Sequence, residues 1–188
     1  MKSNKLNLFE LLSSLEKNTD IHLGRLLILL NEFTDNGRVQ LEGLTKLVKL
    51  DFLLRYPLYL EKALLSKNKS TKKLNISDFE KLSIESKMIR YKYGPWDPKY
   101  REFINILIGR GLASFCVKGR TINIDLTGKG VQVADTLLKD NSHKFIAERA
   151  KLLRQHFNFS GTHLMKFIYK TFPEITTLEY GKQIDYEN

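Results

Sequence analysis

Residues 93–126 constrain the fold more than any other stretch, because they predict a helix start, an amphipathic helix and a hairpin in succession. Asp97 can cap free backbone N–H groups, and Pro98 fits the first helical position without losing a hydrogen bond. Gly111 can end the helix in a left-handed conformation. Apolar side chains recur between these signals at helical spacing: Tyr100, Phe103, Ile104, Leu107 and Ile108. We therefore expect an amphipathic helix over 98–110.

Two short runs that alternate apolar and polar residues follow this helix and predict a β-hairpin over 114–126. Lys118-Gly119-Arg120 lies between the runs and suits the hairpin tip. Thr127 can cap a further helix that extends to about Leu138. A helix followed by a two-stranded wing is typical of a winged helix. This fold usually binds DNA or docks onto a protein and rarely carries out chemistry.

The remainder of the sequence is predicted to be mainly helical. Apolar spacing and capping signals predict helices over 21–34, 42–54, 58–65, 77–86, 143–157 and 160–172. Arg38-Val39-Gln40 is predicted to form a short first strand, and Met88–Tyr93 an extended segment. Roughly forty residues separate the second helix from the helix that begins at Pro98. In a helix-turn-helix, only a few residues join the two corresponding helices. We read this excess as an insertion.

These elements predict an α+β, mostly helical fold: a winged helix-turn-helix with a helical insertion and a C-terminal helical extension. The expected parts are an N-terminal arm at 1–19, a winged-helix domain at 20–140 with the insertion at about 56–93, and the extension at 141–188. At 188 residues the chain is long enough to bury a sizeable core.

The charge balance favours an acidic partner. Lysine and arginine number 31 against 21 aspartates and glutamates, a net charge of +10, which suits nucleic acid, a membrane surface or an acidic protein face. The apolar run Leu26–Leu30 is too short to span a bilayer, and the N-terminus is unlike a signal peptide. We expect a cytoplasmic protein with no membrane partner.

The sequence offers little support for an enzyme or for a cofactor. Its four histidines are scattered: His22, His143, His156 and His163. One cysteine, Cys116, excludes an intramolecular disulfide and a cysteine-based zinc site, and we expect it to be a small buried residue. A phosphate-binding glycine-rich loop and a nucleophile elbow are both missing. We therefore expect no catalytic residues, no metal and no cofactor.

Two segments, 43–57 (GLTKLVKLDFLLRYP) and 88–97 (MIRYKYGPWD), carry a resemblance, together with 126–130 (LTGKG). Over about residues 20–140 the chain resembles the middle component of ABC-three-component systems, the small accessory subunit of Lamassu-type bacterial defence operons. The resemblance implies a non-enzymatic subunit that works with an SMC/Rad50-like ATPase and a separate effector, often a nuclease, against phage or plasmid DNA. It carries no catalytic residues onto this sequence.

Basic and amide side chains around the expected helix and wing are the candidates for contact with double-stranded DNA. Those that we select are Lys87, Arg90, Lys92, Lys99, Arg101, Asn105, Lys118 and Arg120. Side chains on an exposed helix can reach phosphates or base edges, and a wing tip can hold a backbone phosphate. The alternatives are a solvated helix face, a tip that is basic for solubility, and an edge strand protected by charge at 87–92. The lysines at 67–73 are expected to lie in a solvated, mobile loop, and the alternative is that they follow a DNA backbone.

Four aromatic residues are candidates for binding a partner protein. Tyr93 and Trp96 can anchor a partner or lie in the core beneath the wing. Phe145 and Phe157 lie in the expected C-terminal helices, which can either pack on the winged helix or grip the ATPase.

We therefore expect an accessory subunit that bridges an SMC-like ATPase and an effector and adds basic surface along the DNA path. One alternative is a stand-alone transcriptional regulator that reads an operator as a symmetric dimer. A second is a pure scaffold without DNA contact.

Overall fold

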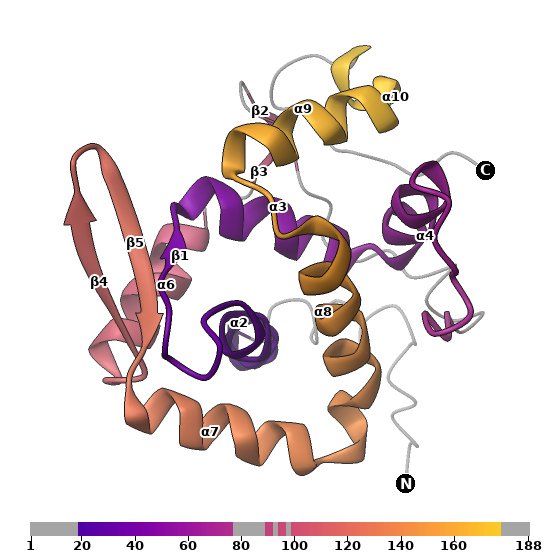
Figure 1. Ribbon diagram of the computed structural model, residues 1–188. Coiled ribbons are helices and arrows are strands. Elements are labelled where there is room, and N and C mark those ends of the chain that lie inside the picture. Colours follow the sequence, from indigo (N-terminus) through magenta and orange to yellow (C-terminus); the bar gives the residue numbers. More distant parts are fainter. Residues whose placement is uncertain (1–18, 77–88, 92–93, 97–98, 178–188) are drawn as a thin grey trace, which may run out of the picture.

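The computed structural model describes residues 19–76, 89–91, 94–96 and 99–177. Among these residues the fold is mostly helical α+β with a small three-stranded antiparallel sheet (Figure 1). The helices are α2 (Thr19–Phe33), α3 (Leu44–Arg55), α4 (Pro57–Ser66), α6 (Tyr100–Gly109), α7 (Gly128–Lys139), α8 (Lys144–Phe157), α9 (Gly161–Thr171) and α10 (Pro173–Thr177), with a 3-10 turn η1 (Asn141–His143). The strands are β1 (Leu41–Glu42), β2 (Ile89–Tyr91), β3 (Gly94–Trp96), β4 (Ala113–Lys118) and β5 (Thr121–Leu126).

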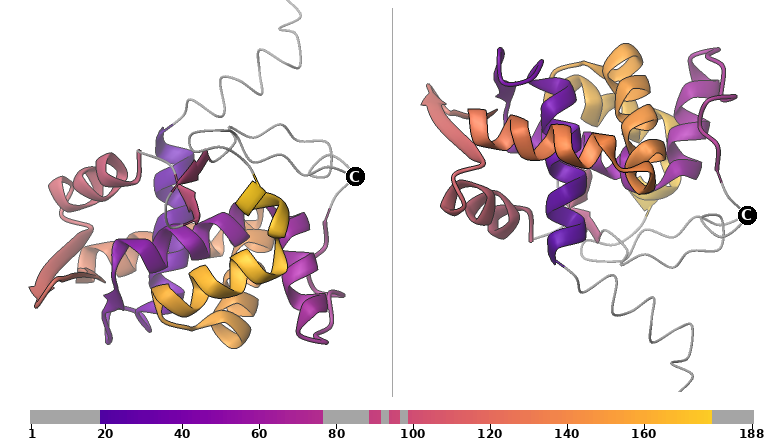
Figure 2. Two further views of the ribbon diagram at one scale, coloured as in Figure 1. Left: turned by 90° about the horizontal axis from the view of Figure 1, so that it is seen from above. Right: turned by 90° about the horizontal axis from the view of Figure 1, so that it is seen from below.

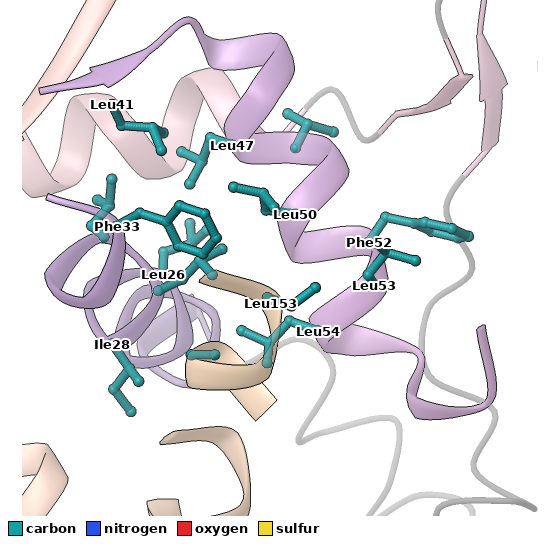
Figure 3. Close-up of a cluster of buried hydrophobic side chains, with 14 of the residues drawn as sticks. Leu26, Ile28, Phe33, Leu41, Leu47, Leu50, Phe52, Leu53, Leu54 and Leu153 are labelled. Atoms are coloured by element: carbon teal, nitrogen blue, oxygen red, sulfur yellow. The ribbon is translucent and has the colours of Figure 1, made fainter. Parts of the chain in front are cut away.

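Helix α2 forms the centre of the molecule. Figure 1 views it end-on, and α3, α6, α7 and α8 all pack against it. Every residue from His22 to Asn31 is buried, so this helix is covered on all sides. In the core, Leu26 and Phe33 of α2 approach Leu47 and Leu50 of α3, while Leu153 of α8 lies nearby (Figure 3).

The sheet has the order β1-β5-β4, with both pairs antiparallel. Lys118 lies opposite Thr121 in the register, which leaves a two-residue turn at the hairpin tip. Gly119 takes the first turn position with φ +61°, a conformation that glycine adopts without strain. The predictions of the hairpin, its tip and the helix after Thr127 are confirmed, since Thr127 Oγ1 accepts a hydrogen bond from Gly130 N–H.

The first strand forms slightly later than predicted, at Leu41–Glu42 instead of 38–40. The backbone N–H groups of Arg38 and Val39 both donate to the carbonyl of Thr34. Residues 35–37 have positive φ, so this segment forms the turn that ends α2. A second small hairpin, β2–β3, pairs Ile89 with Trp96, whereas only its first strand was predicted. The helix predicted at 77–86 lies outside the described residues.

The C-terminal helices contribute to the same core as the rest of the protein. Helix α8 packs on α2 and α3, and α9 packs on α3 and α4 (Figure 2). The Phe172 ring lies edge-on to Tyr59, with 4.9 Å between ring centroids. Phe172 and Ile175 are fully buried. The predicted helices at 143–157 and 160–172 are therefore confirmed, and together they cover α2, α3 and α4.

The lysine-rich segment after α4 is not a purely solvated loop as predicted. Lys67 Nζ donates to the carbonyl of His156 at 3.1 Å and lies 4.3 Å from the centroid of the Phe159 ring. Arg149 Nε donates to the carbonyl of Leu74, whose side chain is buried. The segment is therefore packed against α8, and the lysines at 69, 72 and 73 remain exposed.

Candidate nucleic-acid and partner interface

Helix α6 presents a polar side to solvent and an apolar side to the core, as predicted. Tyr100, Phe103, Ile104 and Leu107 are buried. The exposed side carries three of the predicted DNA-contacting residues, namely Lys99, Arg101 and Asn105, together with the acidic Glu102. Arg101 and Asn105 are four residues apart and therefore share one helical face.

A buried polar cluster attaches the first turn of α6 to α2 and α3. Arg25 of α2 donates through Nε to Asp51 Oδ1 at 2.8 Å and through Nη2 to Oδ2 at 3.1 Å. The hydroxyl of Tyr100 on α6 donates to the same carboxylate of α3. His22 stacks on Phe103, with ring centroids 5.2 Å apart. Polar and aromatic contacts therefore both fix α6 relative to the central helix.

Burial and the neighbouring charges act in opposite directions on Asp51. Burial raises the pKa of this fully buried carboxyl, but the charge and hydrogen bonds of Arg25 lower it, with help from Tyr100 and Arg55. The pKa of Asp51 therefore lies below its usual value. Burial, followed by the Asp51 charge, raises the pKa of Tyr100 well above the usual value. The carboxylate is ionised and the phenol protonated at neutral pH, as their hydrogen bond requires.

The hairpin tip carries Lys118 and Arg120, both exposed as predicted. Glu42 and Asp125 are the nearest acidic residues in the sheet, and neither forms an ion pair with the tip within the described ranges. Together, α6 and the hairpin bring five of the eight predicted DNA-contacting residues to exposed positions on neighbouring elements.

The structure leaves the other predicted contacts undescribed. Lys87, Lys92 and Tyr93 lie outside the described residues. Arg90 lies in β2 and Trp96 in β3, where the backbone positions are described but the side chains are not.

The two C-terminal phenylalanines differ in exposure. Phe145, in the first turn of α8, is 47% exposed and available to a partner. Phe157 is fully buried among Phe159 and Phe167, with ring centroids 6.3 and 5.3 Å away. The predicted partner contact of Phe157 is therefore wrong, because this side chain packs in the core against Phe159 and Phe167.

Sequence reasoning missed an apolar patch on the outer half of the hairpin. Phe115, Val117 and Ile122 are 54%, 62% and 47% exposed. Alternation correctly predicted that these side chains share one sheet face, but only the inner residues of that face reach the core. Cys116, on the opposite face, is half-buried beside Gln40 and not fully buried as predicted. The length of the strands, six residues each, was the available signal that the tip extends beyond the core.

No protein family, curated protein or solved structure matches this chain. Within the described ranges no group of three or more His, Cys, Asp or Glu side chains is placed to hold a metal ion. The described helices are all too short or too polar to cross a membrane.

Proposed function

We propose that this chain is a non-enzymatic accessory subunit of an SMC/Rad50-like ATPase complex in anti-phage or anti-plasmid defence. In this role it bridges the ATPase and an effector such as a nuclease, and it adds basic surface that contacts double-stranded DNA. The resemblance of 43–57 and 88–97 supports the choice of complex. The arrangement of α6 beside a basic hairpin supports the DNA contact.

The order of the elements supports a winged helix as the finer description of the fold. Helix α2, strand β1, helices α3 and α6, and the β4–β5 hairpin follow one another in that order, apart from the insertion of α4 and β2–β3. The first strand pairs with the last, so the sheet order is β1-β5-β4. In this arrangement α6 corresponds to the helix that enters a major groove, and the hairpin corresponds to the wing.

The observation that carries the proposal is the joint exposure of Arg101 and Asn105 on α6 and of Lys118 and Arg120 on the hairpin. Cations on two adjacent elements can contact phosphates on both sides of a groove. Glu102 lies on α6 among them and opposes tight binding. We therefore propose weak binding with little sequence preference, in which the protein contributes binding energy and geometry but no bond making.

The proposal is tested by fluorescence anisotropy with a labelled random-sequence duplex over a range of salt concentrations. Arg101→Glu, Lys118→Glu and Arg120→Glu should each weaken binding, and removal of one phosphate contact should reduce the slope of log K against log salt by about 0.9. Lys170→Glu, an exposed lysine on α9, is the matched control and should have little effect. Unchanged affinity in all three hairpin and α6 variants would refute the DNA contact.

The function in a complex is tested by coexpression with the SMC-like ATPase that the proposal expects a neighbouring gene to encode. The ATPase should co-purify with this subunit, and Phe145→Glu should reduce its recovery. An absence of co-purification would refute the accessory role.

A stand-alone transcriptional regulator is the second candidate, because Arg101 and Asn105 lie one turn apart where a recognition helix reads bases. A regulator should select one duplex from a random pool by a factor of at least about 10³. The accessory subunit should recover no preferred sequence.

A further inference from the structure

Strand β4 forms a free edge of the sheet. The order β1-β5-β4 places β4 outermost, and in Figure 1 no described element lies beside the outer edge of β4 toward the hairpin tip. The strand is six residues long and contains no proline. A charged side chain occurs only at its end, Lys118. An exposed edge with these properties is a template for pairing with another strand.

The face next to this edge is apolar. Phe115 and Val117 lie on the edge strand, and Ile122 lies opposite Val117 on β5. A complete side chain of this size has a surface of about 150–200 Å². At exposed fractions of 47–62%, the three side chains together expose on the order of 300 Å² of apolar surface to water. That is the size of the largest apolar patch on a typical monomer, and such patches are often functional.

The backbone of β4 directs hydrogen-bonding groups to the free edge at the same residues. The backbone carbonyl of Ile122 in β5 points toward β1, where it accepts a backbone hydrogen bond. Successive residues of a strand direct their backbone N–H and C=O groups to opposite sides. The backbone groups of Asn123 therefore point toward β4, where Cys116 lies opposite. Phe115 and Val117 flank Cys116 and therefore direct their N–H and C=O groups outward. Within the described chain these groups have no hydrogen-bond partner.

We propose that β4 pairs with β4 of a second copy of this chain, antiparallel and centred on Cys116, to form a continuous six-stranded sheet. This register places Phe115 opposite Val117 of the second copy, and Val117 opposite its Phe115. Both pairs combine an aromatic with a β-branched side chain, a favourable combination across strands. The outward N–H and C=O groups of the two copies meet at these same positions.

Charge supports the choice of a second copy as the occupant. On the opposite sheet face the register places Lys118 across from Ser114 of the second copy. Within each copy Ser114 lies opposite Asp125, which is half-buried. Each Lys118 therefore approaches an Asp125 of the other chain. The two basic tips lie at opposite ends of the paired strands, so that they do not repel each other strongly.

The proposed dimer goes beyond the proposed function and does not depend on it. Pairing of the two edges buries the backbone of both β4 strands and the adjoining flanks of Phe115 and Val117, while the outer faces of the two apolar patches stay exposed side by side. The buried area is therefore below the roughly 1,200 Å² of standard specific interfaces. We therefore expect a reversible dimer with a dissociation constant on the order of 10–100 µM.

Sedimentation velocity of the full chain from 1 to 300 µM tests the association. Wild type should shift from monomer to dimer across this range. Val117→Lys places a charge in the patch, and Val117→Pro removes an outward N–H without breaking the β4–β5 ladder. Each variant should weaken the dimer at least tenfold. Leu65→Glu, at an exposed leucine of α4, should leave the dissociation constant within twofold. Circular dichroism establishes that each variant is folded.

Cross-linking tests the register. Directly opposed residues at a non-hydrogen-bonded position lie close enough for a disulfide. Diamide, which accepts two hydrogens from two thiols, should therefore convert wild type to a Cys116–Cys116 dimer. Ser70→Cys in a Cys116→Ser background carries its thiol on an exposed loop and should cross-link at least tenfold more slowly. A monomer at 300 µM, a dimer that withstands both Val117 substitutions, or equal cross-linking of the two cysteines would overturn the proposal.

Discussion

Substitution of Asp51 by asparagine tests the buried cluster that holds α6 in place. The change preserves the size of the side chain and removes the charge that pairs with Arg25. The Arg25 guanidinium, almost completely buried, would then lose the charge of the Asp51 carboxylate. Removal of one member of a buried ion pair typically costs about 3–5 kcal/mol. Tyr100→Phe removes only the hydroxyl and should cost about 1–3 kcal/mol.

Urea unfolding followed by circular dichroism at 222 nm measures both variants. The expected result is a lower midpoint with an unchanged dependence on urea concentration. The double variant Arg25→Met, Asp51→Leu replaces the pair by apolar groups and should recover most of the lost stability. A loss below about 1 kcal/mol for Asp51→Asn would refute the reasoning, because the buried guanidinium would then not require its partner.

The pH dependence of the difference in stability between wild type and Asp51→Asn provides a second test. The pKa of Asp51 is lowered in the fold, so its ionised form stabilises the protein above its ordinary pKa of 3.8. This contribution is lost as the pH falls below 3.8 and through the folded-state pKa. The difference between wild type and Asp51→Asn should stay constant from pH 7 to about pH 5 and shrink in more acidic solution. A difference that grows on acidification contradicts the direction of the shift.

Three further substitutions test the packing, and urea unfolding measures each. In Gly130→Ala the new Cβ would lie 1.9 Å from the carbonyl oxygen of Leu112, so the variant should lose about 3 kcal/mol or more although alanine favours a helix. Thr127→Ala removes the cap of α7 and should lose about 1 kcal/mol, while an unchanged midpoint would argue against the cap. Burial lowers the pKa of Lys49 to about 8, so the charged amine destabilises the fold at pH 7. Lys49→Met should add roughly 2–4 kcal/mol there, and should abolish the rise in wild-type stability between pH 8 and 10.5.

The local elements of this protein could be predicted because their signals lie within a few residues of one another. The apolar side of α6 was evident from the spacing of Tyr100, Phe103 and Leu107. Gly119 between two alternating runs predicted the hairpin tip, and Thr127 predicted the start of α7. Neighbours at three or four positions along a helix, or two along a strand, determine each of these features.

Exposure in the candidate interface was harder to predict, because periodicity identifies a shared face but not the length of chain that covers it. Phe115 and Ile124 alternate identically with their neighbours, yet Phe115 is exposed and Ile124 is buried. The first lies on the free edge strand, while the second lies on β5 opposite Leu41. Phe145 and Phe157 differ in the same way along α8, since Phe167 of α9 packs on Phe157 whereas Phe145 is 47% exposed.

By itself the sequence determined most of the helices and the β4–β5 hairpin, since these depend on contacts between near neighbours and on backbone preferences of residues such as glycine and proline. It also determined the positive charge that the exposed surface carries. Only the tertiary structure decided that Asp51 is buried against Arg25, 26 positions away, and against Tyr100, 49 positions away. The burial of a side chain depends on segments brought together from distant parts of the chain, and no local pattern records which segment will cover it.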